Sequence, residues 1–358
     1  MPTKTRKKKR LRSVKRFKHD RPMIRTSERS TFGTCRQQWW WGYVQRLTPI
    51  REKPALRFGT LVHKAMELRY PPGIRRGPHP AETFERLYEE DLEDQHEKWG
   101  FRADDGSEEG EEWTNALDVG VDMLEMFIER YGKDEEWKVI ESEMTFQVPV
   151  LSAAGKTIFY YVGTMDGVWE NRMDGSIRII DWKTTKNDPM KEGLLKTLDE
   201  QATAYWTWGC DWLESQGILT APQLQALNGM EFTFLRKAKR DARPQNAEGH
   251  YLNKDGSVSK KQPPPYFHRE TVYRGDAEKE NARERAVQQF AEMQMVRDGD
   301  LAHYKTPATG KMGHCNWCDF KDICELHEIG SDWEELLEAT TTEWDPYAAH
   351  EIQEEGKR

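Results

Sequence analysis

The sequence has no long apolar run, and it contains few cysteines for its 358 residues. A membrane-spanning helix needs about 20 consecutive apolar residues, so we expect no contact with a membrane. The charged N-terminus is not followed by an apolar segment, so we expect no secretory signal. The phosphate-binding motif Gly-x4-Gly-Lys-Ser/Thr is missing, so any nucleotide-driven motor must be a separate protein. Aromatic residues are not scarce: 14 Trp, 13 Phe and 12 Tyr predict a packed core and exclude disorder throughout.

The five cysteines are odd in number and come without an export signal. Both facts argue against a disulfide framework and predict a reducing, cytoplasmic compartment, with a prokaryotic or viral host expected. Three of the cysteines fall within ten residues, as Cys315, Cys318 and Cys324, whereas Cys35 lies far upstream. Cys210 stands among tryptophans and is expected to be buried and inert.

The net charge of −8 is unevenly distributed. Residues 1–25 carry twelve lysines and arginines and one acid, or +11, and the other 333 residues carry 42 bases and 61 acids, or −19. A basic arm on an acidic body is suited to contact with a polyanion such as nucleic acid. A merely solvated tail is the alternative.

The hydrophobic pattern predicts an α/β protein with a mixed central sheet. The strands are expected at residues 144–150, 158–169, 177–182 and 230–235. The helices are expected from residue 58, at 199–214 and at 276–298.

Shifts in composition predict the boundaries of the domain and its insertions. We expect a flexible basic arm at 1–25, one main domain at 26–330 and an acidic tail at 331–358. Within the main domain we expect an acidic helical insertion at 70–135, a basic loop excursion at 237–272 and a cysteine cluster at 311–326.

Two predicted strands each carry a carboxylate at or near their ends, Asp166 and Asp181. A buried carboxylate is costly unless it binds a cation or is hydrogen-bonded, and two of them suit Mg²⁺ or Mn²⁺. Lys183 leaves the same face of its strand as Asp181, where it can orient a water and offset charge on a phosphoryl group. A simple ion pair of Asp181 with Lys183 or Lys186 is the alternative that this spacing alone favours.

Asp166, Asp181 and Lys183 belong to a set of four short segments that follow one another along the chain. They are Gly59-Thr60-Leu61-Val62-His63-Lys64-Ala65-Met66-Glu67, Gly163-Thr164-Met165-Asp166, Asp181-Trp182-Lys183-Thr184 and Gln201-Ala202-Thr203-Ala204-Tyr205. Together they resemble the motifs of the PD-(D/E)xK nucleases, and among these the RecB-like family, with Trp182 where that family usually has Tyr. The resemblance implies a restriction-endonuclease-like core with a mixed central sheet and a C-terminal iron–sulfur staple, to which the sequence adds the acidic helical insertion.

The resemblance also implies a role for each matched residue. Asp166, Asp181, His63 and the Trp182 carbonyl are expected to ligate the metal ion, and Lys183 to activate the hydrolytic water. Gln201 and Tyr205 are expected to steady the lysine or to contact the scissile phosphate. Glu141 and Glu143 precede the first predicted strand and are not included in the predicted site.

The cysteines fit the same resemblance. RecB-like members such as AddB-type helicase–nuclease subunits and CRISPR adaptation exonucleases hold a [4Fe–4S] cluster with one cysteine before the core and three after it. Here the ligands are expected to be Cys35, Cys315, Cys318 and Cys324, with Arg36 where the family often has Pro. Spacing alone does not distinguish iron–sulfur from zinc, although the distant first cysteine favours the cluster.

Two segments bear on the substrate. The block Trp39–Tyr43 either packs in the core or stacks on single-stranded bases. The loop after the fourth strand is expected to contact a nucleic-acid backbone through its basic residues, Arg236, Lys237, Lys239, Arg240, Arg243, Lys254, Lys260 and Lys261.

These features predict a metal-dependent DNA nuclease. We expect an exonuclease that hydrolyses phosphodiesters at DNA ends or in single strands, in recombination, repair or nucleic-acid processing. The alternatives are a catalytically silent DNA-binding module that acts with a separate helicase or recombinase, and a zinc-stapled hydrolase of RNA.

Overall fold

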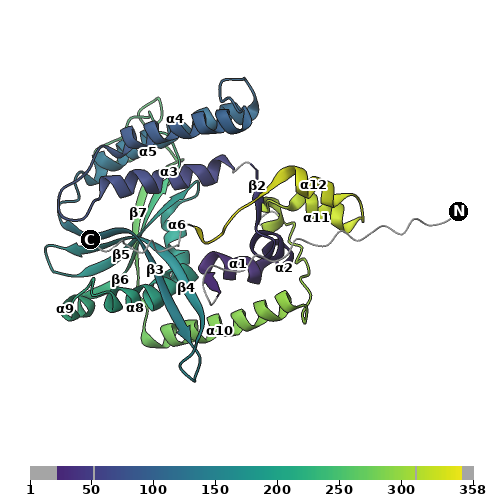
Figure 1. Ribbon diagram of the computed structural model, residues 1–358. Helices are drawn as coiled ribbons and strands as arrows, with labels where there is room; N and C mark the ends of the chain where they lie inside the picture. The colour runs from purple at the N-terminus through teal and green to yellow at the C-terminus, as the bar shows by residue number, and fades with distance from the viewer. Residues whose placement is uncertain (1–21, 51–52, 311–312, 349–358) are drawn as a thin grey trace. The chain divides into compact units, whose positions relative to one another are not determined.

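The computed structural model describes residues 22–50, 53–310 and 313–348, and most of the predicted basic arm lies outside these ranges. The chain forms two compact units. The described residues of the terminal unit fall within Met1–Arg51, Gln147–Val162 and Arg283–Arg358, and those of the sheet unit within Glu52–Phe146 and Gly163–Ala282. Figure 1 shows the elements of both, and strands β3 (Trp137–Leu151) and β4 (Thr157–Asn171) contribute residues to each unit.

The sheet unit is built on strands that pair in the order β4, β5 (Ile177–Thr185), β6 (Leu227–Arg236) and β7 (Phe267–Val272). Strand β5 is antiparallel to β4 and parallel to β6, and β7 is antiparallel to β6. Strand β3 also pairs with β4. The prediction of an α/β protein with a mixed sheet is therefore confirmed, and the arrangement is consistent with a restriction-endonuclease-like fold.

Three long helices pack against each other in the sheet unit, α3 (Pro54–Arg69), α4 (Pro80–Trp99) and α5 (Glu108–Tyr131) (Figure 1). Proline at the first position starts α3 and α4, where its missing N–H costs nothing, and Ser107 caps α5 by accepting from the Gly110 N–H. Their apolar faces form one core with strand residues such as Trp169 and Trp182. Burial of these large aromatic surfaces fixes the helices on the sheet.

A second group of helices follows β5. It comprises α6 (Pro189–Leu194), η2 (Leu195–Leu198), α7 (Glu200–Ala204), the π-helical turn η3 (Tyr205–Gly209), α8 (Cys210–Ser215) and α9 (Ala221–Gln225). Asp199 caps α7 by accepting from the Ala202 N–H at 2.9 Å. Gly209 lets η3 approach β4, because a Cβ there would lie 2.9 Å from the Met165 sulfur. This group places Gln201 and Tyr205 beside the strands that carry Asp166 and Asp181.

The terminal unit contains short elements from both ends of the chain. They are β1 (Met23–Arg25), α1 (Thr26–Thr34), α2 (Arg36–Trp39), the π-helical turn η1 (Trp40–Val44), β2 (Leu47–Pro49), η4 (His314–Trp317), α11 (Lys321–Glu328), α12 (Trp333–Thr340) and β8 (Thr341–Glu343). Strand β1 pairs in parallel with residues 160–162 of β4, and β2 pairs with β8. The long helix α10 (Asp276–Asp298) enters this unit at Arg283.

The C-terminal segment has structure that the sequence analysis did not predict. Strand β8 is antiparallel to β2, and the Trp344 indole donates to the Gly42 carbonyl at 3.0 Å. Tyr347 is only 2% exposed, and its hydroxyl bonds to the buried carboxylate of Glu28. Among the described residues, no helix has both the length and the apolarity to span a membrane.

Candidate active site and cysteine centre

Asp166 and Asp181 lie on neighbouring strands of the sheet unit. The antiparallel register pairs Gly167 with Ile180, and its continuation by one residue sets Asp166 beside Asp181. Asp166 accepts a hydrogen bond from the Trp182 N–H at 2.7 Å. The two carboxylates predicted to act together are thus brought together by the sheet itself.

Lys183 is held by two neighbours. Its Nζ lies 2.6 Å from Asp181 Oδ2 and donates to Gln201 Oε1 at 2.9 Å. Burial, which lowers the pKa of Lys183, is outweighed by Asp181 and Asp166, and the pKa is raised above its usual value. The lysine is therefore charged and fixed in position at neutral pH.

Gln201 and Tyr205 complete the network around the lysine. The Gln201 amide donates to Asp181 at 3.1 Å and to the Tyr205 hydroxyl at 2.7 Å, and Tyr205 in turn donates to the Thr164 carbonyl. Gly163 makes this approach possible, because a Cβ there would lie 2.6 Å from the Phe146 ring and 3.3 Å from Tyr205. A glycine is therefore required for steric reasons at the first position of the Gly-x-x-Asp segment.

His63, Glu143 and Asp166 form a group that can hold a metal ion. Each offers one ligand atom, and these atoms lie within 4.8 Å of one another. His63 Nδ1 is 3.2 Å from Asp166 Oδ2, and Asp166 raises the pKa of His63 against the opposing effect of burial. An imidazole and two carboxylates are a donor set that suits Mn²⁺ or Mg²⁺.

Glu143 is the member of this group that the sequence analysis did not include in its predicted site. Its backbone has φ of +47°, a left-handed conformation that non-glycine residues rarely adopt within a strand. Burial, together with the charge of Asp166, raises the pKa of Glu143 to about 7. The sequence signal that could have found it is the alternation of Trp137, Val139 and Glu141, which extends the strand in front of residue 144.

These groups line a cavity of about 680 Å³ in the sheet unit. Its lining includes His63, Glu143, Asp166, Trp182 and Lys183. Asp181 is fully buried and does not line the cavity; burial raises its pKa to about 6, although Lys183 opposes this. Direct ligation of a metal by Asp181 and by the Trp182 carbonyl stays a prediction.

The basic loop after β6 is partly neutralised. Lys239 pairs with Asp118 at 2.8 Å, and Arg240 pairs with Glu129 at 2.7 Å, both acids being on α5. Arg243 pairs with Asp241 within the loop. Lys237, by contrast, lines the cavity of the metal-ligating group.

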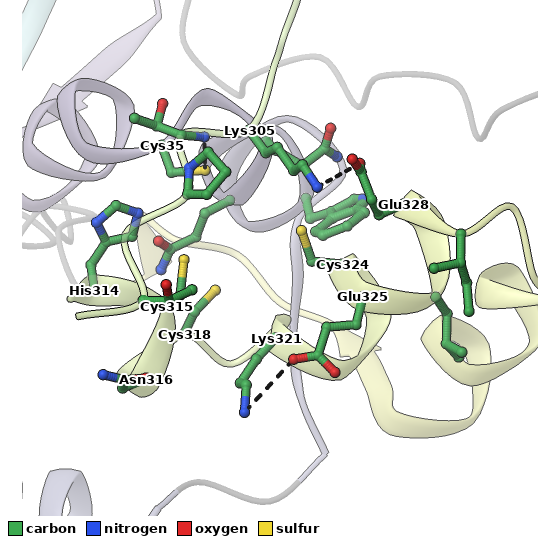
Figure 2. A pocket seen from close by; sticks show the side chains of 18 residues that line it. Cys35, Lys305, His314, Cys315, Asn316, Cys318, Lys321, Cys324, Glu325 and Glu328 are labelled. Atoms are coloured by element: carbon green, nitrogen blue, oxygen red, sulfur yellow. Dashed lines mark hydrogen bonds and ion pairs between the residues drawn. The ribbon is translucent and has the colours of Figure 1, made fainter. Parts of the chain in front are cut away.

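Cys35, Cys315, Cys318 and Cys324 line one cavity of about 520 Å³ in the terminal unit. Figure 2 shows their side chains around it. The backbone N–H groups of Thr306 and Ala308 donate to the sulfurs of Cys35 and Cys315 at 3.4 and 3.3 Å. All five cysteines are free, and burial raises the pKa of the separate Cys210 to about 12.

The aromatic block next to Cys35 packs in the terminal unit. Trp39 and Trp41 are buried, and the Trp39 indole donates to Glu28 at 3.0 Å. Trp40 stacks on His303 with ring centroids 4.1 Å apart. Of the two alternatives for this block, the structure favours packing.

The comparison with protein families agrees with this geometry. The family model described as "PD-(D/E)XK nuclease superfamily" matches residues 26–325. Among curated proteins the comparison finds no match. Because the family model covers most of the sequence, and the strands, the carboxylates and the lysine are in place, the chain belongs to the PD-(D/E)XK nuclease superfamily, whose members are typically metal-dependent nucleases.

Proposed function

We propose that this protein is a metal-dependent deoxyribonuclease of the RecB-like type that acts on DNA ends or single strands. The observation that carries the proposal is a charged lysine fixed beside a metal-ligating group. Lys183 is held by Asp181 and Gln201, and it lines the same cavity as His63, Glu143 and Asp166. This is what phosphodiester hydrolysis requires: a cation site, and a fixed positive group where charge develops on phosphate.

The metal-ligating residues fit a divalent cation. Glu143 and Asp181 both have raised pKa values, about 7 and about 6, so their charges are poorly compensated by the protein alone. A bound Mg²⁺ or Mn²⁺ would supply that compensation, together with Lewis-acid chemistry for the phosphoryl group. His63, Glu143 and Asp166 are the proposed ligands, with Asp181 and the Trp182 carbonyl as further candidates.

The chain's own residues orient the reaction. Lys183 can donate to a water or to a phosphate oxygen, while Asp181 keeps it protonated. Gln201 bonds to Lys183, Asp181 and Tyr205 at once, so it sets the direction of the lysine. Gln201 and Tyr205 are therefore proposed as positioning residues for Lys183.

A comparison of linear and circular substrates tests the exonuclease proposal. The protein is incubated with Mn²⁺ and end-labelled linear single-stranded DNA, closed circular single-stranded DNA, and RNA of the same sequence. We expect short products from linear DNA, intact circles and intact RNA, and no products in EDTA. Cleaved circles would replace the exonuclease with an endonuclease, and RNA cleavage would change the substrate. DNA binding without cleavage would favour the catalytically silent module that serves a helicase or recombinase.

We further propose that the cysteine cavity holds a [4Fe–4S] cluster. Four thiolates are the ligand set of such clusters, and backbone N–H groups directed at two of the sulfurs are suited to stabilise their negative charge. Four thiolates also suit a tetrahedral zinc ion, which stays the alternative for this cavity.

Anaerobic purification tests the cluster. We expect a brown protein that absorbs near 400 nm and contains iron and acid-labile sulfide, with loss of both in Cys35→Ser and retention in Cys210→Ser. Zinc in place of iron, or colour that persists in Cys35→Ser, would contradict this assignment without affecting the nuclease proposal.

A further inference from the structure

Three lysines line the cavity of the metal-ligating group, Lys64, Lys183 and Lys237. Two of them are paired: Lys64 lies 2.5 Å from Glu67, and Lys183 lies 2.6 Å from Asp181. Among the residues that the structure describes, no carboxylate lies within ion-pair distance of Lys237. The cavity therefore holds one cation whose counter-charge must come from elsewhere.

The backbone fixes where Lys237 lies. It directly follows β6, and its N–H donates to the Thr185 carbonyl at 2.7 Å, so it sits beside the end of the strand that carries Lys183. Its Nζ is 5.0 Å from the centre of the Phe58 ring on α3. His63 follows Phe58 by five residues on the same helix, about 7.5 Å along the axis at 1.5 Å per residue. The ring that Lys237 contacts and the proposed ligand His63 therefore lie little more than one turn apart on α3.

The surroundings of Lys237 make its lack of a partner costly. The side chain is half-buried, and burial together with the exposed Lys186 lowers its pKa. Contact with the Phe58 ring stabilises the ammonium group by an amount on the order of 1 kcal/mol, and it does not replace an anion. In a cavity open to substrate, a phosphate group is the anion suited to pair with such a partly desolvated cation.

We propose that Lys237 binds the phosphate of the nucleotide next to the scissile bond, as a subsite of the nuclease cavity. This inference rests on the proposed nuclease function. It gives the substrate two anchors in one cavity, the metal-ligating group at the reacting phosphate and Lys237 at the neighbouring phosphate. Lys237 is then a binding residue that sets the register of the strand, and Lys183 remains the group beside the reacting phosphate.

The test compares Lys237→Gln, which removes the charge and keeps a polar side chain, with the same substitution of Lys98, an exposed lysine of α4. Binding of a short fluorescent single-stranded oligonucleotide is measured in EDTA at several salt concentrations. We expect Lys237→Gln to weaken binding about tenfold and to reduce the salt slope by about one phosphate contact, with Lys98→Gln unchanged. An equal melting temperature for the variants excludes a folding defect.

Neutral phosphates locate the contact. In single-turnover cleavage with Mn²⁺, a methylphosphonate is placed at one linkage at a time on either side of the scissile bond. We expect substitution of the adjacent linkage to raise the half-saturating protein concentration about tenfold in the wild type and not at all in Lys237→Gln. An equal effect in both proteins, or unchanged binding and salt slope in Lys237→Gln, would overturn the proposal. If the wild type bound DNA without cleaving it, the nuclease proposal would fail and the binding comparison would still decide the role of Lys237.

Discussion

At the scale of single residues, the metal-ligating group includes a carboxylate, Glu143, whose charged form and backbone conformation are both unfavourable. Burial and Asp166 raise the pKa of Glu143 to about 7, and its backbone adopts a left-handed conformation. Strain of this kind persists only where the surrounding structure enforces it, and it concentrates at functional sites. Without a cation, Glu143 is therefore a strained and poorly compensated acid, and metal binding should relieve that electrostatic cost.

The pH dependence of metal binding follows from this. The pKa of Glu143 is raised from 4.5 to about 7 in the folded protein. In EDTA its contribution to the unfolding free energy is thus present below pH 4.5 and is lost as the pH rises through 7. Because the proton competes with the cation, we expect Mn²⁺ to raise the melting temperature more at pH 8 than at pH 6.

Glu143→Gln tests the assignment, with Glu141→Gln, two residues earlier on β3, as the matched control. We expect the first variant to lose most of the Mn²⁺-induced increase in melting temperature, and the second to keep it, in differential scanning fluorimetry. An unchanged response to Mn²⁺ in Glu143→Gln at both pH values would remove Glu143 from the metal site.

Most residues of the site can be predicted from the sequence because they stand in short local motifs. Asp166, Asp181, Lys183, Gln201 and Tyr205 are indeed brought into one network. Glu143 is different: alternation in front of residue 144 indicates a longer strand, but the left-handed conformation of Glu143 carries no local sequence signal. Its role and theirs in catalysis remain predictions.

At the scale of elements, the basic loop and the acidic helix α5 compensate each other. Lys239 and Arg240 pair with Asp118, Asp122 and Glu129. Exposed pairs of this kind contribute at most about 1 kcal/mol each, so they are easily exchanged for other anions. A nucleic acid that contacts this loop would therefore compete with the helix for the same cations.

Removing the acids should release those cations. We expect the triple variant Asp118→Asn, Asp122→Asn, Glu129→Gln to bind single-stranded DNA several-fold more tightly at low salt, with a steeper salt dependence. The matched control is Glu82→Gln, Glu85→Gln, Glu89→Gln on α4, which changes the net charge equally. Equal gains in both triples would mean that overall charge, and not these pairs, controls the affinity.

The C-terminal segment is a structural element of the terminal unit. Strand β8 pairs with β2, and the Tyr347 hydroxyl donates to the carboxylate of Glu28. The same carboxylate accepts a hydrogen bond from the Trp39 indole and lies 3.0 Å from Arg297. We expect a chain that ends at Thr340 to melt several degrees lower than one that ends at Ala348, because it leaves buried polar groups unpaired. Equal melting temperatures would show that the segment contributes no stability.

Long periodic elements were predictable from the sequence, and short ones were not. The helix at 276–298 and the central strands follow from the hydrophobic pattern, which is dictated by local burial. Strand β8 and the π-helical turns at Trp40–Val44 and Tyr205–Gly209 depend on contacts with distant residues. Such elements carry little local signal, because tertiary packing and not propensity forms them.

At the scale of the whole molecule, the family match spans both units, and each unit has its own chemical centre. The sheet unit holds the metal-ligating group with Lys183, and the terminal unit holds the four cysteines. Residues from both ends of the chain form the terminal unit, so a centre that binds Cys35 together with Cys315, Cys318 and Cys324 links the two ends. The two groups of residues are chemically distinct, and substitutions in either one leave the residues of the other intact.

The most direct test of the central claim is the cleavage of end-labelled single-stranded DNA in Mn²⁺ by Lys183→Ala beside the wild type and Lys98→Gln. We predict metal-dependent degradation by the wild type and by Lys98→Gln, and a rate at least about 100-fold lower in Lys183→Ala, because one fixed electrostatic contact at the reacting phosphate is lost. Degradation at the wild-type rate by Lys183→Ala, or no degradation by a folded, metal-loaded wild-type protein, would contradict the account.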